Sequence, residues 1–108
     1  ISLTKLLGPI AEVRAPGAQI LAMVKPQFEL GRGRVGRGGV VRDPALRAEA
    51  VLSVASAAAD LGLVSLDVAA AGLPGPKGNV EVFLRLGEGE SVADLERRAH
   101  VEAQGSQP

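Results

Sequence analysis

The sequence is poor in several residue types that mark particular classes of protein. It contains no cysteine and a single histidine, His100, which excludes a disulfide scaffold and Cys-ligated zinc and argues against a histidine metal site. Phe28 and Phe83 are its two aromatic residues, so we expect no stacking platform for a run of single-stranded bases. No apolar run approaches the roughly 18 residues of a membrane span, and no signal-peptide pattern is present.

Charge is balanced over the 108 residues but is unevenly distributed. The segment from Lys25 to Arg42 holds five cations and one anion, a net charge of +4. The segment from Gly87 to Pro108 holds five acids and two arginines, a net charge of −3. A local basic patch is sufficient to contact phosphate, although arginines in a loop are commonly just solvated.

The most informative stretch runs from Ile20 to Arg42. Its first five residues, Ile20 to Val24, are all apolar and are typical of a strand buried on both faces. Lys25 follows at the strand end, and open α/β sheets bind ligands beyond the carboxyl ends of their strands. A lysine that merely extends into solvent is the commoner explanation on position alone. The glycine-rich loop from 31 to 39 fits neither a phosphate loop nor a dinucleotide fingerprint, and we expect it to be mobile.

Hydrophobic periodicity predicts an α/β fold with a three-stranded mixed sheet and flanking helices. The long helix between the first two strands implies a parallel crossover, and a compact loop makes the third strand antiparallel. The last five residues, from Gln104, are expected to be disordered. The expected elements are a helix capped by Ser2, a strand Ala18–Val24, a helix Pro44–Leu61 capped by Asp43, a half-exposed edge strand Leu63–Val68, a strand Val80–Leu86 and a short helix to about Val101.

A second candidate residue, Glu81, lies just after the glycine- and proline-rich loop that precedes the last strand. Strict alternation places Val80, Val82 and the later apolar residues on one face of this strand, and Glu81 on the other. From this pattern alone, Glu81 is as readily an ordinary polar-face residue as a functional carboxylate.

Two motifs, VKPQFELGRGRVGRGGVVRDPALR and GLPGPKGNVEVFLRL, resemble the C-terminal half of the TlyA family. Its members are S-adenosylmethionine-dependent ribosomal RNA 2′-O-methyltransferases, many of them also called hemolysins, with a catalytic domain similar to that of FtsJ-type enzymes. The resemblance covers residues 1–86, which we interpret as a partial methyltransferase domain. We expect residues 87–108 to form an acidic tail with a short helix and a disordered end. Because the chain opens at Ile1 within a motif of the family, we expect it to be a piece of a longer protein.

The resemblance implies the C-terminal half of a Rossmann-like class I methyltransferase. The three strands would be the fifth, sixth and seventh of a seven-stranded sheet, with the last inserted antiparallel between the other two. Of the family's Lys-Asp-Lys-Glu catalytic tetrad, the second lysine corresponds to Lys25 and the glutamate to Glu81. The first lysine, the aspartate and the glycine-rich cofactor loop are absent, so no cofactor-binding residue is assigned within this chain.

These residue types suit the chemistry that the resemblance implies. A ribose hydroxyl must lose its proton as the methyl group arrives, and a lysine serves either as a base or as an ammonium ion that stabilises the developing alkoxide. Glu81 would orient the lysine or the ribose. RNA recognition relies on phosphate and 2′-hydroxyl contacts. The expected donors are Arg32, Arg34, Arg37, Lys77 and Asn79.

We therefore expect part of a cytoplasmic enzyme that acts on ribosomal RNA or ribosomal subunits, and a chain that is inactive by itself. An alternative is a catalytically silent module that contacts RNA or associates with itself through an exposed strand edge. A membrane-active hemolysin is a third alternative. The helix Pro44–Leu61 argues against it, because this alanine-rich segment lacks aromatic anchors and a cationic face.

Overall fold

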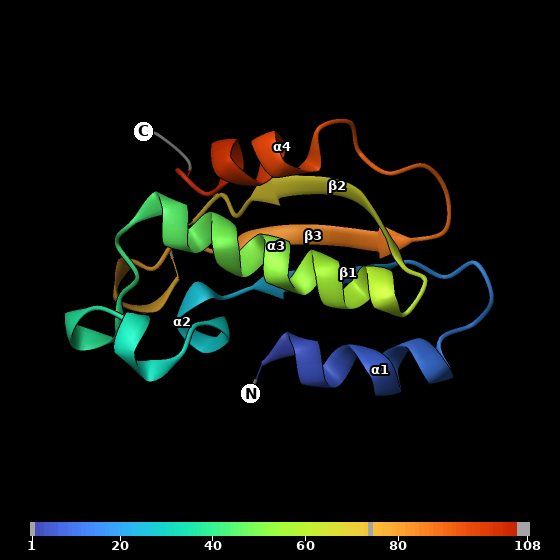
Figure 1. Ribbon diagram of the computed structural model, residues 1–108, viewed down its shortest axis with the longest axis horizontal. Coiled ribbons are helices and arrows are strands. Elements are labelled where there is room, and N and C mark those ends of the chain that lie inside the picture. The colour runs from blue at the N-terminus through green and yellow to red at the C-terminus, as the bar shows by residue number, and fades with distance from the viewer. Residues whose placement is uncertain (1, 74, 106–108) are drawn as a thin grey trace.

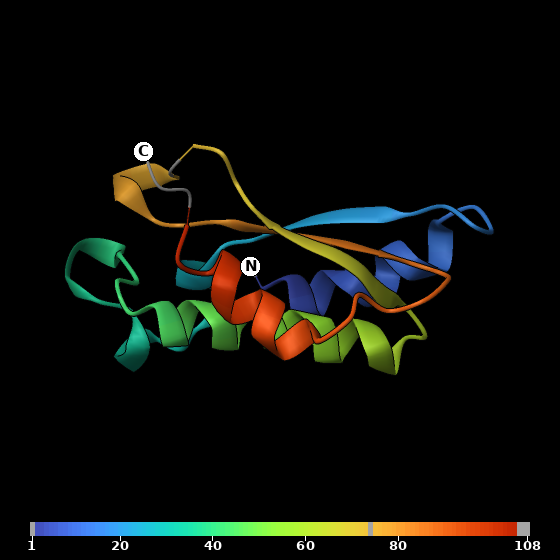
Figure 2. The same cartoon turned by 90° about the horizontal axis from the view of Figure 1, so that it is seen from above.

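The chain forms two layers, a three-stranded sheet and a set of helices that cover one of its faces (Figures 1 and 2). The computed structural model describes residues 2–73 and 75–105. The predicted strands and the long helix agree with the structure to within two residues at each end. In chain order the helices and strands are α1 Leu3–Val13, β1 Ile20–Val24, α2 Pro26–Glu29, α3 Pro44–Asp60, β2 Val64–Ala70, β3 Val82–Gly87 and α4 Leu95–Glu102.

The last strand lies in the middle of the sheet. The strand order is β1-β3-β2, and β3 is antiparallel to both of its neighbours. It follows that β1 and β2 run in the same direction, as the predicted crossover requires. Their carboxyl ends lie at one edge of the sheet, where Val82 at the start of β3 is paired with Val24 on one side and with Ala70 on the other. The predicted insertion of the last strand is confirmed.

A β-bulge changes the pattern that the sequence predicts for β2. The register shifts between Ser65 and Asp67, so that Leu66 is the extra residue. Ser65 and Val68 therefore face the core, with exposed fractions of 5% and 0%. Alternation of apolar and polar residues in this segment predicts Leu66 on the buried face and Ser65 on the exposed face. This is wrong because one inserted residue reverses a two-residue period.

Helix α3 packs closely on the sheet because much of its buried side consists of small residues. Val51, Val54, Ala55 and Ala58 are all buried in the main core. The helix begins as predicted, with Asp43 Oδ1 accepting a hydrogen bond of 2.9 Å from the backbone of the second helical residue. This cap and Pro44 at the first position fix the start of the helix close to the candidate site.

The glutamate of the short helix α2 ties it to the start of α1. Ser2 caps α1 as predicted, and its Oγ also donates a hydrogen bond of 2.6 Å to Glu29 Oε1. The backbone N–H of Leu3 donates to Glu29 Oε2 at 2.8 Å. A carboxylate at a helix N-terminus complements the helix dipole. Helix α1 continues through Pro9 to Val13.

Helix α4 covers the outer edge of β2. Val92 N donates to Ser65 O at 2.8 Å, and Arg98 Nη2 donates to Val68 O at 2.6 Å. Glu102 Oε1 accepts from the backbone N–H of Ala70 at 2.8 Å. The backbone of Val92 and the side chains of Arg98 and Glu102 thus satisfy backbone groups that a further strand would otherwise pair with.

The segment after β3 packs into the same core as the residues before it. Ala99 and Ala103 are fully buried, and α4 contacts both α3 and β2. Two of the residues that were expected to be disordered, Gln104 and Gly105, donate backbone hydrogen bonds to α4. The remainder, 106–108, lies outside the described residues.

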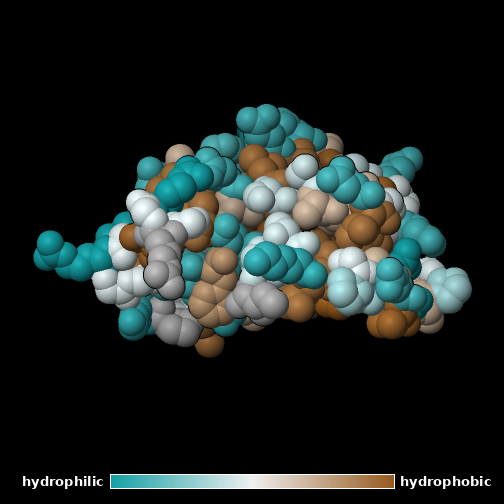
Figure 3. All heavy atoms as spheres, turned by 60° about the horizontal axis from the view of Figure 1, so that its bottom comes forward, coloured by the Kyte–Doolittle hydropathy of each residue, from teal (hydrophilic) through white to brown (hydrophobic). Residues whose placement is uncertain are grey.

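Strand β1 differs from the strand that the sequence predicts. Helices cover one face of the sheet (Figure 2), and on the other face Leu21 is 66% exposed and Met23 37% exposed. The prediction of burial on both faces is therefore wrong for the described chain. Within residues 2–73 and 75–105 no strand pairs with the outer edge of β1. Figure 3, which turns the α1 side of the molecule toward the viewer, shows apolar areas among hydrophilic side chains.

The central position of β3 predicts a large cost for truncating its core residues. Leu84 is fully buried, so Leu84→Ala should lower the free energy of unfolding by about 2–5 kcal/mol, measured by urea denaturation. Leu73→Ala is the matched control, because Leu73 is 82% exposed and should change stability by less than about 0.5 kcal/mol. Equal effects of the two substitutions would contradict this description of the core.

Candidate functional site

The candidate site lies where β1 ends and β3 begins. Because Val24 is paired with Val82, the residues just beyond them, Lys25 and Glu81, face each other across the two strands. Lys25 Nζ lies 3.7 Å from Glu81 Oε2. The structure thus brings together the two residues that were predicted to be catalytic, at the sheet edge where α/β proteins bind ligands.

Glu81 is a buried carboxylate with several neighbours that hold it. It is 6% exposed, and Gln27 Nε2 donates a hydrogen bond of 3.4 Å to Glu81 Oε2. A Cβ atom at Gly75 would overlap the Glu81 carboxyl group, so the loop backbone approaches it as closely as glycine permits. A buried charge needs such partners, because an unpaired carboxylate in the interior is costly.

Lys25 is more accessible than its partner. Its side chain is 34% exposed, and Nζ lies 5.6 Å from the centroid of the Phe28 ring, within the range of a cation–π interaction. A cavity of about 290 Å³ opens beside this group. Its lining residues are Lys25, Gln27, Phe28, Val35, Gly39, Lys77 and Asn79.

Asn79 connects the two loops that surround the cavity. Its side chain is 2% exposed, accepts a hydrogen bond of 3.0 Å from Val41 N, and donates one of 3.0 Å to Gly39 O. This gives Asn79 a structural role in holding the glycine-rich loop. The RNA contact predicted for Asn79 remains a prediction.

The glycine-rich loop is folded into two 3-10 turns, Arg32–Arg34 and Arg37–Gly39. Gly36 N donates to Val40 O at 3.0 Å, which closes the second turn. Gly38 and Gly39 have φ values of +75° and +77°, a region that glycine enters without strain. The sequence predicts mobility for this loop, and the structure gives it a defined path along the cavity.

The predicted RNA contacts differ in their placement. Arg34 forms a two-point ion pair with Glu49, and Nη2 lies 2.8 Å from Oε1. Its guanidinium holds the pKa of the Glu49 carboxyl below the usual value, so this stabilisation is present above that value and is lost as the pH falls. Arg37 is exposed and Lys77 lines the cavity. The side chain of Arg32 lies outside the described residues.

Two contributors to the site were not predicted, although both lie within the motifs. Gln27, in VKPQFE, is carried by α2, a short helix that was not predicted from the sequence. Proline at its first helical position was the available signal. Gly75 lies in GLPGPKGN and could not be distinguished by sequence from the other glycines of that loop.

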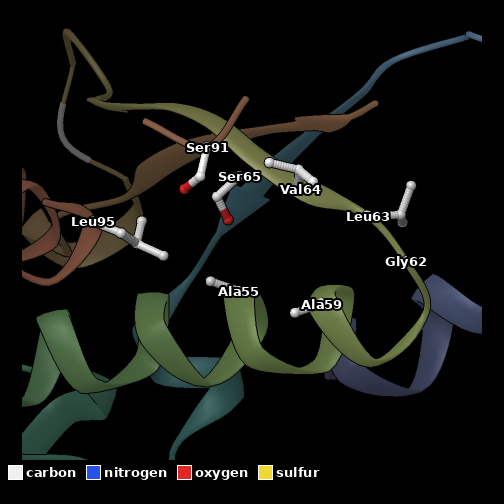
Figure 4. Close-up of a pocket in the computed structure, with 8 residues that line it drawn as sticks. All are labelled: Ala55, Ala59, Gly62, Leu63, Val64, Ser65, Ser91 and Leu95. Carbon is white, nitrogen blue, oxygen red and sulfur yellow. The ribbon is translucent and has the colours of Figure 1, made fainter. Parts of the chain in front are cut away.

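A second cavity, of about 280 Å³, lies at the other end of the sheet, between α3 and the start of β2 (Figure 4). Ser65 and Ser91 are its polar side chains, and the other lining residues are apolar or glycine. It contains no titratable group among its lining residues, so the candidate chemistry lies at the Lys25 end. Of the described helices, none combines the length and apolar character needed to cross a membrane.

The fold and this edge define a class of protein. Two strands run in the same direction on either side of a reversed strand, and a charged pair lies beyond their carboxyl ends, as in the C-terminal part of Rossmann-like methyltransferases. Comparisons with known proteins identify the family within that class. The chain is 54% identical over 86 residues to the 16S/23S rRNA (cytidine-2'-O)-methyltransferase TlyA of Mycobacterium tuberculosis, an alignment that covers 80% of this chain and 32% of that protein. The chain belongs to the TlyA family.

Other comparisons agree with this assignment. The "Putative rRNA methyltransferase YqxC" of Bacillus subtilis is 37% identical over 98 residues, covering 88% of this chain and 35% of that protein. A solved structure, of "a putative hemolysin from Lactococcus lactis", matches with a TM-score of 0.85 at 30% identity, covering 95% of this chain and 51% of that one. No family model matches the chain. The chain spans about a third of the length of these curated relatives.

The close approach of Gly75 to Glu81 generates a prediction. Gly75→Ala should force the carboxylate away from Lys25 and lower the free energy of unfolding by about 1–3 kcal/mol, measured by urea denaturation. Gly72→Ala is the matched control, because a Cβ at Gly72 meets no atom within 4 Å. That control should change stability by less than about 0.5 kcal/mol. If both variants were as stable as the parent chain, the packing of Glu81 beneath the loop would be refuted.

Proposed function

We propose that this chain contributes half of the catalytic group of an S-adenosylmethionine-dependent enzyme that methylates a ribose 2′-hydroxyl of ribosomal RNA. The observation that carries the proposal is the pairing of Lys25 with Glu81 across two strands, with 3.7 Å between Nζ and Oε2. The relative of 54% identity is named for this reaction. The full enzyme would include the remaining length of its relatives, and this chain alone would not methylate RNA.

In the proposed mechanism Lys25 acts as an ammonium ion. Its side chain is part-exposed and lies against a buried carboxylate. As O2′ takes up the methyl group, its proton passes to solvent water at the open cavity, and partial negative charge develops on the oxygen in the transition state. An ammonium group held beside that oxygen lowers the free energy of the charge without having to reorganise during the reaction.

Glu81 is a positioning residue in this mechanism. Its carboxylate is fixed by Lys25, by Gln27 and by the close backbone of Gly75. Such restraint holds Lys25 Nζ in one direction at the cavity and leaves the exposed part of the lysine facing the substrate. Placing a reactive group in advance is a main source of enzymatic rate enhancement.

The cavity residues do not fit the methyl donor itself. Lys25 and Lys77 place two ammonium groups along the cavity, whereas the sulfonium centre of S-adenosylmethionine is also cationic. Of the cavity-lining residues no carboxylate is present to bind the hydroxyls of the donor's ribose. We therefore assign no donor-binding residue in this chain and place the donor in the part of the enzyme beyond it.

The cationic side of the cavity suits RNA instead. Arg37 and Lys77 would contact phosphates, together with Arg32, while Arg34 would do so only after leaving Glu49. Asn79 would contribute by holding the loop in place. The substrate would be ribosomal RNA or a ribosomal subunit, and the protein would act in the cytoplasm.

Substitutions in the full-length enzyme test this proposal. Lys25→Met should reduce turnover about 10²–10⁴-fold, because the charge that stabilises O2′ is lost. Affinity for the methyl donor, measured by calorimetry, should stay nearly unchanged. Lys5→Met is the control, because Lys5 is an exposed lysine of α1, and it should retain full turnover. Unchanged turnover in Lys25→Met would refute the proposed role.

A second proposal concerns self-association, which the open edge of β1 favours. No strand of the described chain pairs with this edge, and Leu21 beside it is 66% exposed. Unpaired edges with apolar side chains readily take up another strand.

Light scattering on the isolated chain should therefore show dimers or larger species at moderate concentration. Leu21→Lys should shift the chain toward monomer, since charge on an edge strand opposes pairing. Val13→Lys is the control, because Val13 is 83% exposed but lies on α1, and it should leave the association unchanged. A monomer at every concentration of the parent chain would exclude the proposal.

A further inference from the structure

Phe28 is an aromatic residue in an unusual position. It is one of two aromatic residues in the chain, and it is 55% exposed. It lies on α2, directly beside the cavity that Lys25, Gln27 and Lys77 also line. An exposed aromatic ring next to polar groups in a concave site is a common feature of ligand binding.

The surroundings of the ring indicate the chemistry of its ligand. Lys25 Nζ is 5.6 Å from the ring centroid, and Lys77 provides a second ammonium group on the cavity wall. Among the described residues Lys77 forms no ion pair, so its charge is available to a ligand. An aromatic face combined with cations suits a nucleotide, which has a flat base and an anionic phosphate.

The distance between Lys25 and the Phe28 ring also agrees with the proposed reaction. In a nucleotide the base and the 2′-hydroxyl are attached to adjacent carbon atoms of the ribose. A hydroxyl held at Lys25 would therefore place its own base within a few ångströms of the Phe28 ring. Bases that proteins read in RNA are commonly unstacked from their neighbours and restacked on an aromatic side chain.

We propose that Phe28 forms a base-binding subsite, in which the base of the nucleotide to be methylated stacks on its ring. This rests on the proposed function, because it places the 2′-hydroxyl at Lys25. The sequence argued against a stacking platform for a run of bases, and a single ring serves a single unpaired nucleotide. Lys77 contacts the phosphate of the same nucleotide or of its neighbour.

The test compares two probes on three forms of the chain. The probes are a short single-stranded RNA with a fluorescent label, and the same RNA with one nucleotide made abasic. The chains are the parent, Phe28→Leu and Phe28→Trp. With the intact RNA, Phe28→Leu should bind about tenfold more weakly, because stacking on one base contributes about that much, whereas Phe28→Trp should bind at least as well as the parent.

With the abasic RNA, the parent and Phe28→Leu should bind equally. Phe83→Leu is a further control, because Phe83 lines a separate cavity with Leu21 and Arg85, and it should bind both probes as the parent does. If Phe28→Leu weakened both probes equally, the ring would shape the cavity without contacting a base, and the proposal would be wrong. Absence of measurable RNA binding by the parent chain would also overturn it.

These outcomes are separate from those that test methylation. If Lys25→Met lost turnover but Phe28→Leu weakened both RNA probes equally, the proposed methyltransferase function would be supported and the base-binding subsite would be refuted. If Phe28→Leu weakened only the intact RNA but Lys25→Met kept full turnover, base binding at Phe28 would be supported and the catalytic role of Lys25 would be refuted.

Discussion

The candidate site depends on the register between β1 and β3. Val24 at the end of β1 is paired with Val82 at the start of β3. Lys25, which follows β1, and Glu81, which precedes β3, therefore lie side by side. A slip of either strand by one residue would turn that strand's side chain to the opposite face of the sheet, away from its partner. Antiparallel insertion of the last strand therefore creates the Lys25–Glu81 pair, and the rest of the site is arranged around it.

Burial of Glu81 explains much of the surrounding structure. A carboxylate that is 6% exposed needs charge and hydrogen-bond donors, and Lys25 and Gln27 supply them. The loop backbone at Gly75 closes over it. Asn79 then fastens this loop to the glycine-rich loop across the cavity. The contacts that hold the cavity walls in place are thus connected to the buried carboxylate of Glu81.

The sequence predicted the features that depend on local chemistry. Asp43 with Pro44 fixed the start of α3, and alternation from Val82 to Leu86 identified the buried face of β3. Family resemblance supplied the strand order and the identity of Lys25 and Glu81. Features that depend on tertiary neighbours were not predictable in this way. The bulge beside Leu66, the ion pair between Arg34 and Glu49, and the exposure of Leu21 follow from packing that no local pattern encodes.

The isolated sheet also has two edges of different character. Residues Val92, Arg98 and Glu102 satisfy backbone groups along β2, whereas β1 is open on its outer edge in the described chain. This asymmetry agrees with a chain that spans about a third of the length of its relatives. In the proposed full enzyme, further strands would continue from β1, on the side where the methyl donor would be placed.

We propose that Lys25 and Glu81 act as a single unit on one ribose oxygen. A double-mutant cycle in the full-length enzyme tests it most directly, with single-turnover methyl transfer measured for Lys25→Met, Glu81→Gln and the combined variant. Residues that act as a unit are not additive, so the combined variant should be little slower than the slower single variant. If the two losses in rate simply multiplied, Lys25 and Glu81 would act independently, and the account would be contradicted.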